Sequence, residues 1–381
     1  MTSPDPFIGR ELLGGQFKVV QKIGTGGMGS VYKAEQPAMN RMVAIKILHP
    51  KLASRKDLVS RFRREARAMS QLTHPNTVKV FMYGELEEDG SLYIVMELLE
   101  GRNLNQTVRK EGPLDPERAI PILVQVCGAL QEAHDMGIVH RDLKPENIFL
   151  CRQGGLADFP KVLDFGLAKV TERQMRPGSM ILTQEGMVFG TPEFMSPEQA
   201  QGKTLDARSD IYSLAVILYE SLCGKLPFDA KVPMEYIQRH VLEAPIPLNQ
   251  RVPGKLFHPQ LEAVIARALS KLPDERYASA TEFAEALRPF SARGASAYPV
   301  ANTAPGASVA AAISAAPPPI VSSAPPPQKP APASAVSTKS KGRGPSAAHP
   351  GPSTALLAFV ALVFLVVGVA ITLVVMRLLG R

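Results

Sequence analysis

The sequence predicts an α+β domain over residues 17–290, an Ala/Pro/Ser-rich linker over 291–354 and one transmembrane helix over 355–376. Three observations lead to this organisation. Strand-like alternation interrupted by glycines near the N-terminus gives way to longer stretches with helical spacing. The composition changes at residue 291, and an uncharged apolar run follows the linker. Apolar residues make up 45% of the 381 residues, which is enough for a sizeable core.

The first strand leads into a glycine-rich loop. Apolar alternation begins at Phe17 and continues into the segment Ile23–Val31, which has glycines at 24, 26 and 29. Glycines allow a tight turn and bring backbone amides close to phosphate oxygens. A lone GxGxxG pattern is weak evidence. Because a second strand follows here rather than a helix, the pattern argues against the dinucleotide-binding fingerprint.

A short apolar strand, Val43–Lys46, comes next and ends in a lysine. Such a lysine is often only a solvated residue, but after a glycine-rich loop it can reach phosphates as a point charge. Residues 55–72 then show helical spacing, and Glu65 is the only acid of this stretch after Asp57. Two further apolar runs, 78–84 and 92–98, predict a hairpin.

A helical stretch over 116–136 leads to the string His-Arg-Asp-Leu-Lys-Pro-Glu-Asn at residues 140–147. Asp142 supplies a carboxylate that can orient a hydroxyl nucleophile, and Lys144 can neutralise charge on a phosphoryl group. Seventeen residues after Asn147 comes Asp164-Phe165-Gly166. The oxygens of Asn147 and Asp164 are suited to holding a metal ion.

Together these motifs resemble the eukaryotic-like bacterial serine/threonine protein kinases, and most closely their membrane-anchored members. The resemblance implies a two-lobed protein-kinase fold. A small antiparallel-sheet lobe with one helix ends near Leu98, a large helical lobe extends to about residue 290, and ATP binds between them. It also implies transfer of the γ-phosphoryl group of ATP to Ser or Thr hydroxyls of cytoplasmic proteins in signal transduction, with Mg²⁺ or Mn²⁺.

The resemblance also gives each motif residue a role. Glu65 is expected to pair with Lys46, Met96 to close the back of the adenine pocket, and Glu97 and Leu99 to bind adenine through their backbone. The expected catalytic residues are Asp142, Lys144, Asn147, Lys46 and Glu65, and the expected metal ligands are Asn147 and Asp164. The expected nucleotide contacts are Ile23, Gly24, Thr25, Gly26, Gly27, Met28, Gly29, Ser30, Val31, Ala44, Lys46, Met96, Glu97 and Leu99.

The segment after the Asp-Phe-Gly motif also follows the family. Gly190-Thr191-Pro192 is typical of the serine/threonine subgroup, and Thr191 is expected to bridge Asp142 and Lys144. Ser196-Pro197-Glu198 replaces the usual Ala-Pro-Glu, and Tyr212 stands where the family has Trp. Glu198 is expected to form a buried ion pair with Arg276.

Regulation is expected in the loop between Asp164 and Glu198. Arg141 precedes the catalytic aspartate, and a phosphate on the loop could neutralise this charge and order the loop. Thr183 is the leading candidate for autophosphorylation, because related bacterial kinases carry a phosphorylated threonine at this distance from Thr191.

Charge and cysteine usage exclude some classes. The net charge is +8, but residues 291–354 contribute five cations and no Asp or Glu, so nucleic-acid binding is not expected. The widely spaced Cys127, Cys151 and Cys223 fit no metal-ligand cluster and predict reduced, buried thiols.

The run Ala355–Met376 is uncharged and would extend about 33 Å as a helix, enough to cross a bilayer. A buried core helix is the alternative, although the linker offers no domain to bury it. Residues 1–15 lack a signal-peptide pattern, and Lys339, Lys341 and Arg343 precede the run. These features predict a single-pass protein of the inner cell membrane with a cytoplasmic kinase domain.

Two other functions stay open from the sequence. One is a membrane-tethered pseudokinase that recruits partners without catalysis, and the other is a kinase for a small-molecule hydroxyl. The complete segment through Glu198 argues against the second, because this segment docks peptides in the family. A homodimer that phosphorylates itself in trans is a further open alternative.

Overall fold

The computed structural model describes residues 5–26, 29–49, 56–165 and 191–291, all of which belong to one compact unit. Thr183, nearly all of the predicted linker and the predicted transmembrane helix lie outside these residues. Among the residues described, no helix has the length and apolarity needed to cross a membrane.

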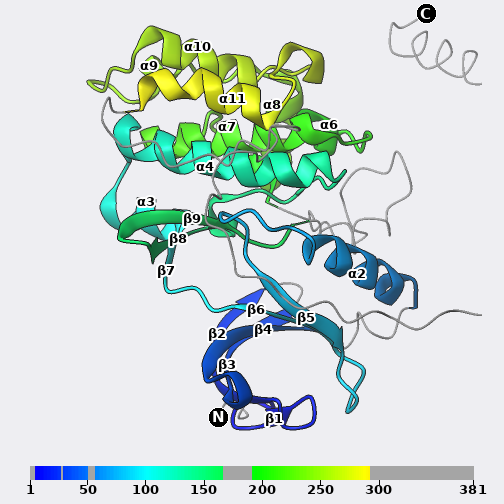
Figure 1. Ribbon diagram of the computed structural model, residues 1–381. Coiled ribbons are helices and arrows are strands. Elements are labelled where there is room, and N and C mark those ends of the chain that lie inside the picture. Colours follow the sequence, from blue (N-terminus) through cyan, green and yellow to red (C-terminus); the bar gives the residue numbers. More distant parts are fainter. Residues whose placement is uncertain (1–4, 27–28, 50–55, 166–190, 292–381) are drawn as a thin grey trace, which may run out of the picture. The chain divides into compact units, whose positions relative to one another are not determined.

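An antiparallel six-stranded sheet forms the N-terminal lobe, with strand order β1-β2-β3-β4-β6-β5 (Figure 1). Its inward side chains are apolar, as the alternation predicted, and β3 lies so close to β4 that a side chain at Gly29 would overlap the carbonyl of Ile47. The strands are β1 (Glu11–Leu12), β2 (Phe17–Gly26), β3 (Gly29–Gln36), β4 (Arg41–Leu48), β5 (Val80–Glu85) and β6 (Leu92–Glu97).

Residues before the predicted domain start at Phe17 also pack on this sheet. The carboxylate of Asp5 accepts a hydrogen bond from the hydroxyl of Tyr32 at 3.1 Å and pairs with Lys22 at 3.2 Å. The ring of Phe7 lies against that of Tyr32, with centroids 5.5 Å apart. The packed part of the chain therefore begins at about Asp5, earlier than the pattern indicated.

The helix α2 (Lys56–Met69) follows the sheet's first four strands. Phe62, Ala66 and Met69 are buried, as the helical spacing predicted. At the end of the helix, the Glu132 carboxylate accepts hydrogen bonds from the backbone amides of Thr73 and His74, both at 2.9 Å. These bonds tie the exit of α2 to the helical lobe.

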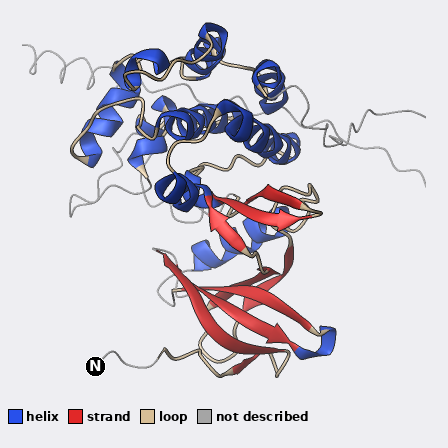
Figure 2. Ribbon diagram, turned by 90° about the vertical axis from the view of Figure 1, so that its left-hand side faces the viewer, coloured by secondary structure: helices blue, strands red, loops and turns tan. Residues whose placement is uncertain are grey.

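The C-terminal lobe is mainly helical, and Figure 2 shows its helices packed side by side. The central helix α7 (Ala207–Cys223) is buried almost throughout, since its apolar residues occur on all faces. The other helices of this lobe are α3 (Leu104–Glu111), α4 (Pro116–Asp135), α6 (Pro197–Ala200), α8 (Pro233–Leu242), α9 (Leu248–Arg251), α10 (Pro259–Ala268) and α11 (Ala280–Leu287). The two-lobed fold that the resemblance implied is confirmed.

A small sheet of β7 (Gly101–Asn103), β8 (Ile148–Gln153) and β9 (Leu156–Val162) connects the lobes. Val162 donates its amide to the carbonyl of Asn76 at 2.7 Å and accepts from the amide of Val78 at 3.0 Å. Because β9 ends two residues before Asp164, these bonds fix the start of the Asp-Phe-Gly motif against the N-terminal lobe.

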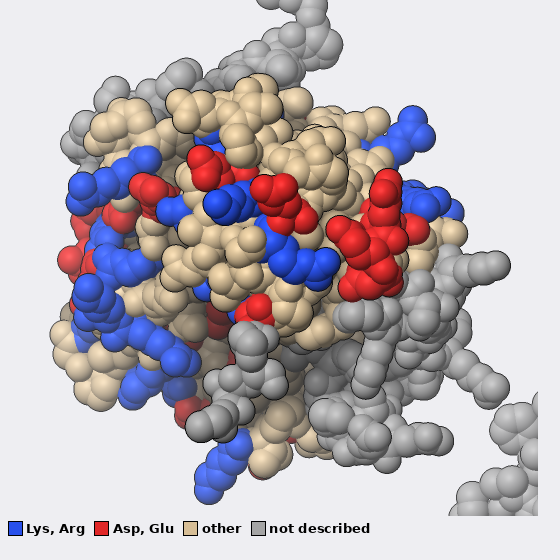
Figure 3. All heavy atoms as spheres, turned by 90° about the horizontal axis from the view of Figure 1, so that it is seen from below, with Lys and Arg blue, Asp and Glu red and all other residues tan. Residues whose placement is uncertain are grey.

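Charges on the described surface are mixed. Figure 3 views the end that carries the six-stranded sheet, where acidic and basic side chains alternate over much of the surface and one larger acidic group stands out. The basic excess of the whole chain therefore does not form one continuous positive surface on this face. All three cysteines are buried and free, as predicted.

Candidate active site

The loop at residues 140–147 is held by bonds among its own residues and by one bond to Thr191. Lys144 Nζ lies 2.9 Å from Asp142 Oδ2 and 3.2 Å from Thr191 Oγ1. Thr191 was expected to bridge Asp142 and Lys144, and in the structure Lys144 is the middle member of these three residues. The amide nitrogen of Asn147 donates to the carbonyl of Asp142 at 2.7 Å. Asp142 keeps 31% of its side chain exposed, so its carboxylate is accessible to a substrate hydroxyl.

The loop backbone is anchored by Asp210 at the start of α7. This buried carboxylate accepts from the amides of His140 at 2.8 Å and Arg141 at 3.0 Å, and it contacts His134 Nε2 at 2.8 Å. Burial raises the pKa of Asp210, but these partners outweigh it, so the pKa lies below its usual value. The anchor holds Arg141 in a left-handed conformation, with φ of 69°. Backbone strain of this kind often occurs at functional sites.

An ion pair joins the two lobes at the Asp-Phe-Gly motif. Lys46 Nζ on β4 lies 2.7 Å from Asp164 Oδ2, and Asp164 has a φ of 57°. Burial raises the pKa of Asp164, while Lys46 and then His140 lower it to below its usual value. The carboxylate is therefore ionised near neutral pH. The expected pair between Lys46 and Glu65 stays a prediction.

The glycine-rich loop has room beside two of its glycines. Among the residues described, a Cβ atom added at Gly26 would meet nothing within 4 Å, and one added at Gly24 would meet only Val31, at 3.8 Å. Gly29, by contrast, is required by the close approach of β4. Gly27 and Met28, two of the expected nucleotide contacts, lie outside the described residues.

The expected adenine-binding residues lie at the end of β6. Met96 is the register partner of Ala44 on β4. The carboxylate of Glu97 pairs with Lys161 on β9 at 2.7 Å and accepts from the amide of Lys79 at 2.8 Å. Lys161 is only 6% exposed. No sequence pattern predicts this pair, because the two residues belong to separate motifs. The pair fixes the start of the segment that connects the lobes.

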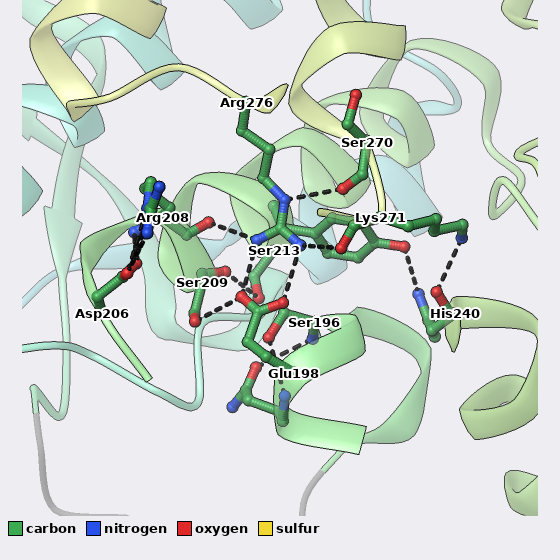
Figure 4. Close-up of polar contacts among 12 residues, drawn as sticks. Ser196, Glu198, Asp206, Arg208, Ser209, Ser213, His240, Ser270, Lys271 and Arg276 are labelled. Atoms are coloured by element: carbon green, nitrogen blue, oxygen red, sulfur yellow. Dashed lines mark hydrogen bonds and ion pairs between the residues drawn. The ribbon is translucent and has the colours of Figure 1, made fainter. Parts of the chain in front are cut away.

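The predicted pair of Glu198 with Arg276 is confirmed. The guanidinium donates to both carboxylate oxygens, at 2.7 and 2.8 Å, and Ser209 Oγ donates to Glu198 at 2.6 Å (Figure 4). Ser196 begins α6 and accepts from the amide of Gln199, so the change from the family's Ala adds a helix cap. Gln199 in turn donates to the carbonyl of Arg141 at 2.6 Å, which links this region to the catalytic loop.

The donor set suits a hard divalent cation. Asp164 offers an ionised carboxylate and Asn147 an amide oxygen, and oxygen ligands of this kind bind Mg²⁺ or Mn²⁺. In the part of the chain that the structure describes, His, Cys, Asp and Glu side chains form no group of three or more that could hold a metal alone. A cation held by Asn147 and Asp164 would therefore need phosphate or water oxygens as further ligands, which is the usual arrangement for Mg²⁺.

Comparisons with known proteins agree with this geometry. The protein kinase domain family matches residues 17–287. The chain is 43% identical to the serine/threonine-protein kinase pkn3 of Myxococcus xanthus, over 74% of this chain and 51% of that protein. It is 41% identical to the serine/threonine-protein kinase pkn2 of the same organism, over 75% and 33%.

The crystal structure of the PknI kinase domain of Mycobacterium tuberculosis matches with a TM-score of 0.57 and 26% identity, over 74% of this chain and 98% of that one. The chain spans about half or less of the length of the two Myxococcus relatives. Because the family match covers well over half of the residues, the chain belongs to the protein kinase family.

Proposed function

We propose that this protein is an ATP-dependent serine/threonine protein kinase. The observation that carries the proposal is the 2.7 Å ion pair between Lys46 and Asp164. It brings the lysine suited to nucleotide phosphates next to the carboxylate suited to the metal. Asp142 and Lys144 lie on the loop whose Asn147 is the second metal-ligand candidate. The relatives named as serine/threonine kinases support the choice of acceptor.

The residues of the site divide the chemistry between them. Asp142 accepts a hydrogen bond from the acceptor hydroxyl and orients it, and Lys144 places its ammonium beside the transferred group. Lys46 binds nucleotide phosphates. Mg²⁺ or Mn²⁺ held by Asn147 and Asp164 would neutralise charge on the phosphates. Because the transition state of phosphoryl transfer is loose, catalysis rests mainly on position and charge.

The direct test is incubation of the full chain with γ-labelled ATP and Mg²⁺, beside Lys46→Met and Asp142→Asn variants. We expect label on Ser and Thr of the intact protein and at least ~10³-fold less in either variant. Absence of label while ATP still raises the melting temperature would instead support the pseudokinase scaffold. Label only on small-molecule alcohols would support the third alternative. Replacing Mg²⁺ with Mn²⁺ shows which cation the site prefers.

We also propose that the kinase is attached to the inner membrane through residues 355–376, with its catalytic domain in the cytoplasm. The uncharged run and the basic residues before it support this orientation. Deleting residues 355–376 should move the protein from the membrane fraction to the soluble fraction. If the deleted form still sediments with membranes, the anchor is wrong.

Autophosphorylation of Thr183 is the regulatory part of the proposal, and it occurs in trans if the chain forms homodimers. Thr183→Ala should lower the rate of phosphorylation of other proteins, because the loop loses the phosphate that would neutralise Arg141. Mass-spectrometric mapping of the labelled wild-type chain identifies the site. Full activity in the Thr183→Ala variant would refute this mechanism.

A further inference from the structure

A buried histidine connects α7 and α8 to the segment around Glu193, which belongs to the loop between Asp164 and Glu198. His240 on α8 has no exposed surface. Its Nδ1 atom lies 2.9 Å from the hydroxyl of Tyr212 on α7, and its Nε2 atom lies 3.0 Å from the carbonyl oxygen of Glu193. Figure 4 shows His240 and Lys271 beside the cluster of Glu198 and Arg276.

The chemistry of the partners fixes the direction of both bonds. A carbonyl can only accept, so Nε2 of His240 carries the proton and donates to Glu193. Nδ1 of the neutral ring then accepts, and the hydroxyl of Tyr212 donates. Burial lowers the pKa of His240 to about 3, which keeps the ring neutral under physiological conditions. The Tyr212 hydroxyl therefore stabilises the tautomer that the carbonyl of Glu193 requires.

The end of α8 is fixed independently. Lys271 Nζ donates to the carbonyl of His240 at 2.8 Å and to that of Arg239 at 3.3 Å. The same ammonium lies 4.5 Å from the ring centroid of Phe228. A helix end held in this way gives His240 little freedom to follow a movement of Glu193. The bond from His240 thus restrains the segment around Glu193 rather than α8.

The segment that His240 holds lies next to the reacting groups. Thr191, two residues before Glu193, contacts Lys144, which contacts Asp142. An acceptor hydroxyl must reach Asp142, so the residues that flank it in a protein substrate must pass close to this segment. A shift of about 1 Å in the position of reacting groups can lower a rate about 10²-fold.

On the basis of the proposed kinase function, we infer that His240 and Tyr212 are positioning residues for the protein substrate. They fix the carbonyl of Glu193, and through it the Thr191–Met195 segment against which the substrate chain binds. None of the bonds described above joins a residue of the nucleotide site to Tyr212, His240 or Glu193. The nucleotide site therefore does not depend on these two positioning residues. Loss of either residue therefore raises the KM for protein and leaves the KM for ATP unchanged.

The test uses Tyr212→Phe in the full chain, with the full-length Asp142→Asn chain as the phosphate acceptor. Phenylalanine keeps the ring, including its contact with the Arg276 guanidinium at 4.9 Å, and removes only the hydroxyl. Tyr219→Phe is the matched control. Tyr219 is equally buried on α7, and its hydroxyl donates to the carbonyl of Ile246 at 2.7 Å, away from Glu193. His240→Leu removes both bonds, and His240→Gln retains a donor for Glu193.

We expect Tyr212→Phe and His240→Leu to raise the KM for the acceptor chain about tenfold, with less than a twofold change in the KM for ATP. Tyr219→Phe should lower the melting temperature similarly and leave both constants unchanged, and His240→Gln should recover part of the loss. The inference is overturned if Tyr212→Phe lowers only the melting temperature, or if both KM values rise together. A wild-type chain that transfers no phosphate would refute the kinase function itself, and with it this inference.

Discussion

Replacing Arg276 with Met removes one partner of a buried ion pair and leaves the other in place. Arg276 is 2% exposed, and its guanidinium makes five hydrogen bonds. Two go to the carboxylate of Glu198, and three go to the backbone carbonyls of Ser270, Lys271 and Arg208. Methionine occupies a comparable volume but donates nothing, so Glu198 would stay buried with Ser209 as its remaining side-chain donor.

The expected loss is about 3–5 kcal/mol of unfolding free energy, since an unpaired carboxylate in this environment is poorly solvated. The penalty should also depend on pH. Burial raises the pKa of Glu198, and the bonds from Arg276 and Ser209 lower it to below its usual value of 4.5. In the wild type the pair therefore stabilises above pH 4.5 and loses its effect as the pH falls. Without Arg276 burial dominates, so the carboxyl can be neutralised by protonation and the penalty should shrink in acid.

Urea unfolding of the full chain, followed by circular dichroism at pH 8 and pH 5.5, measures both effects. Arg208→Met is the matched control, because Arg208 pairs with the exposed carboxylates of Asp206 and Asp274 and should contribute less than about 1 kcal/mol. If Arg276→Met costs no more than Arg208→Met, the bidentate pair does not stabilise the domain as argued. An equal penalty at both pH values would refute the electrostatic explanation, but it would leave the stabilising effect of the pair in place.

Three further predictions follow from the geometry. Asp142→Asn should lower the rate of phosphate transfer at least ~10³-fold without changing the melting temperature by more than a few degrees, as measured with labelled ATP and by calorimetry. Gly29→Ala should destabilise the domain by roughly 1–3 kcal/mol in urea unfolding, because the added methyl group overlaps Ile47. Burial, followed by the neighbouring Glu146 carboxylate, raises the pKa of Glu220 to about 7 from 4.5. Glu220→Gln should therefore stabilise the domain by roughly 2–3 kcal/mol at pH 8 and very little at pH 4.5.

A control variant or a contradicting outcome tests each of these predictions. Gly26→Ala is the control for Gly29→Ala, since its methyl group would meet none of the described residues within 4 Å. The direction in which Glu220 changes stability with pH follows from proton binding. Between pH 4.5 and 7 the folded state binds more protons than the unfolded state, so the wild type loses stability as the pH rises. A gain for Glu220→Gln that is the same at pH 4.5 and pH 8 contradicts the assignment. Retained phosphate transfer by Asp142→Asn would remove Asp142 from the mechanism.

The sequence predicts local motifs well because their residues are close neighbours along the chain. The string at 140–147 folds into one loop, and Asp142, Lys144 and Asn147 contact one another there. The pair of Glu198 and Arg276, 78 residues apart, was predictable only through family resemblance. The roles of bound nucleotide and metal, and the helix at 355–376, stay predictions.

His240 and Lys161 were missed for a physical reason. His240 binds a backbone carbonyl 47 residues away. Every residue has such a carbonyl, so the amino-acid type at that position does not reveal the bond. A histidine that makes such a bond produces no recognisable pattern. Lys161 pairs with Glu97 across 64 residues, and each of these residues is explained locally by its own strand. Only the packing of the lobes reveals that they meet.

Three residues near the start of α7 explain why the site can be rigid although its parts come from distant segments. Ser209 donates to Glu198, Asp210 holds the backbone of the catalytic loop at His140 and Arg141, and Tyr212 directs His240 toward the substrate segment. All three α7 side chains are buried in the same turn, so they cannot move independently. Phosphoryl transfer depends on the relative position of the loop and the substrate segment. Since one helical turn sets both positions, a packing change there should alter substrate binding and turnover together, whereas a change at Lys46 should act through the nucleotide.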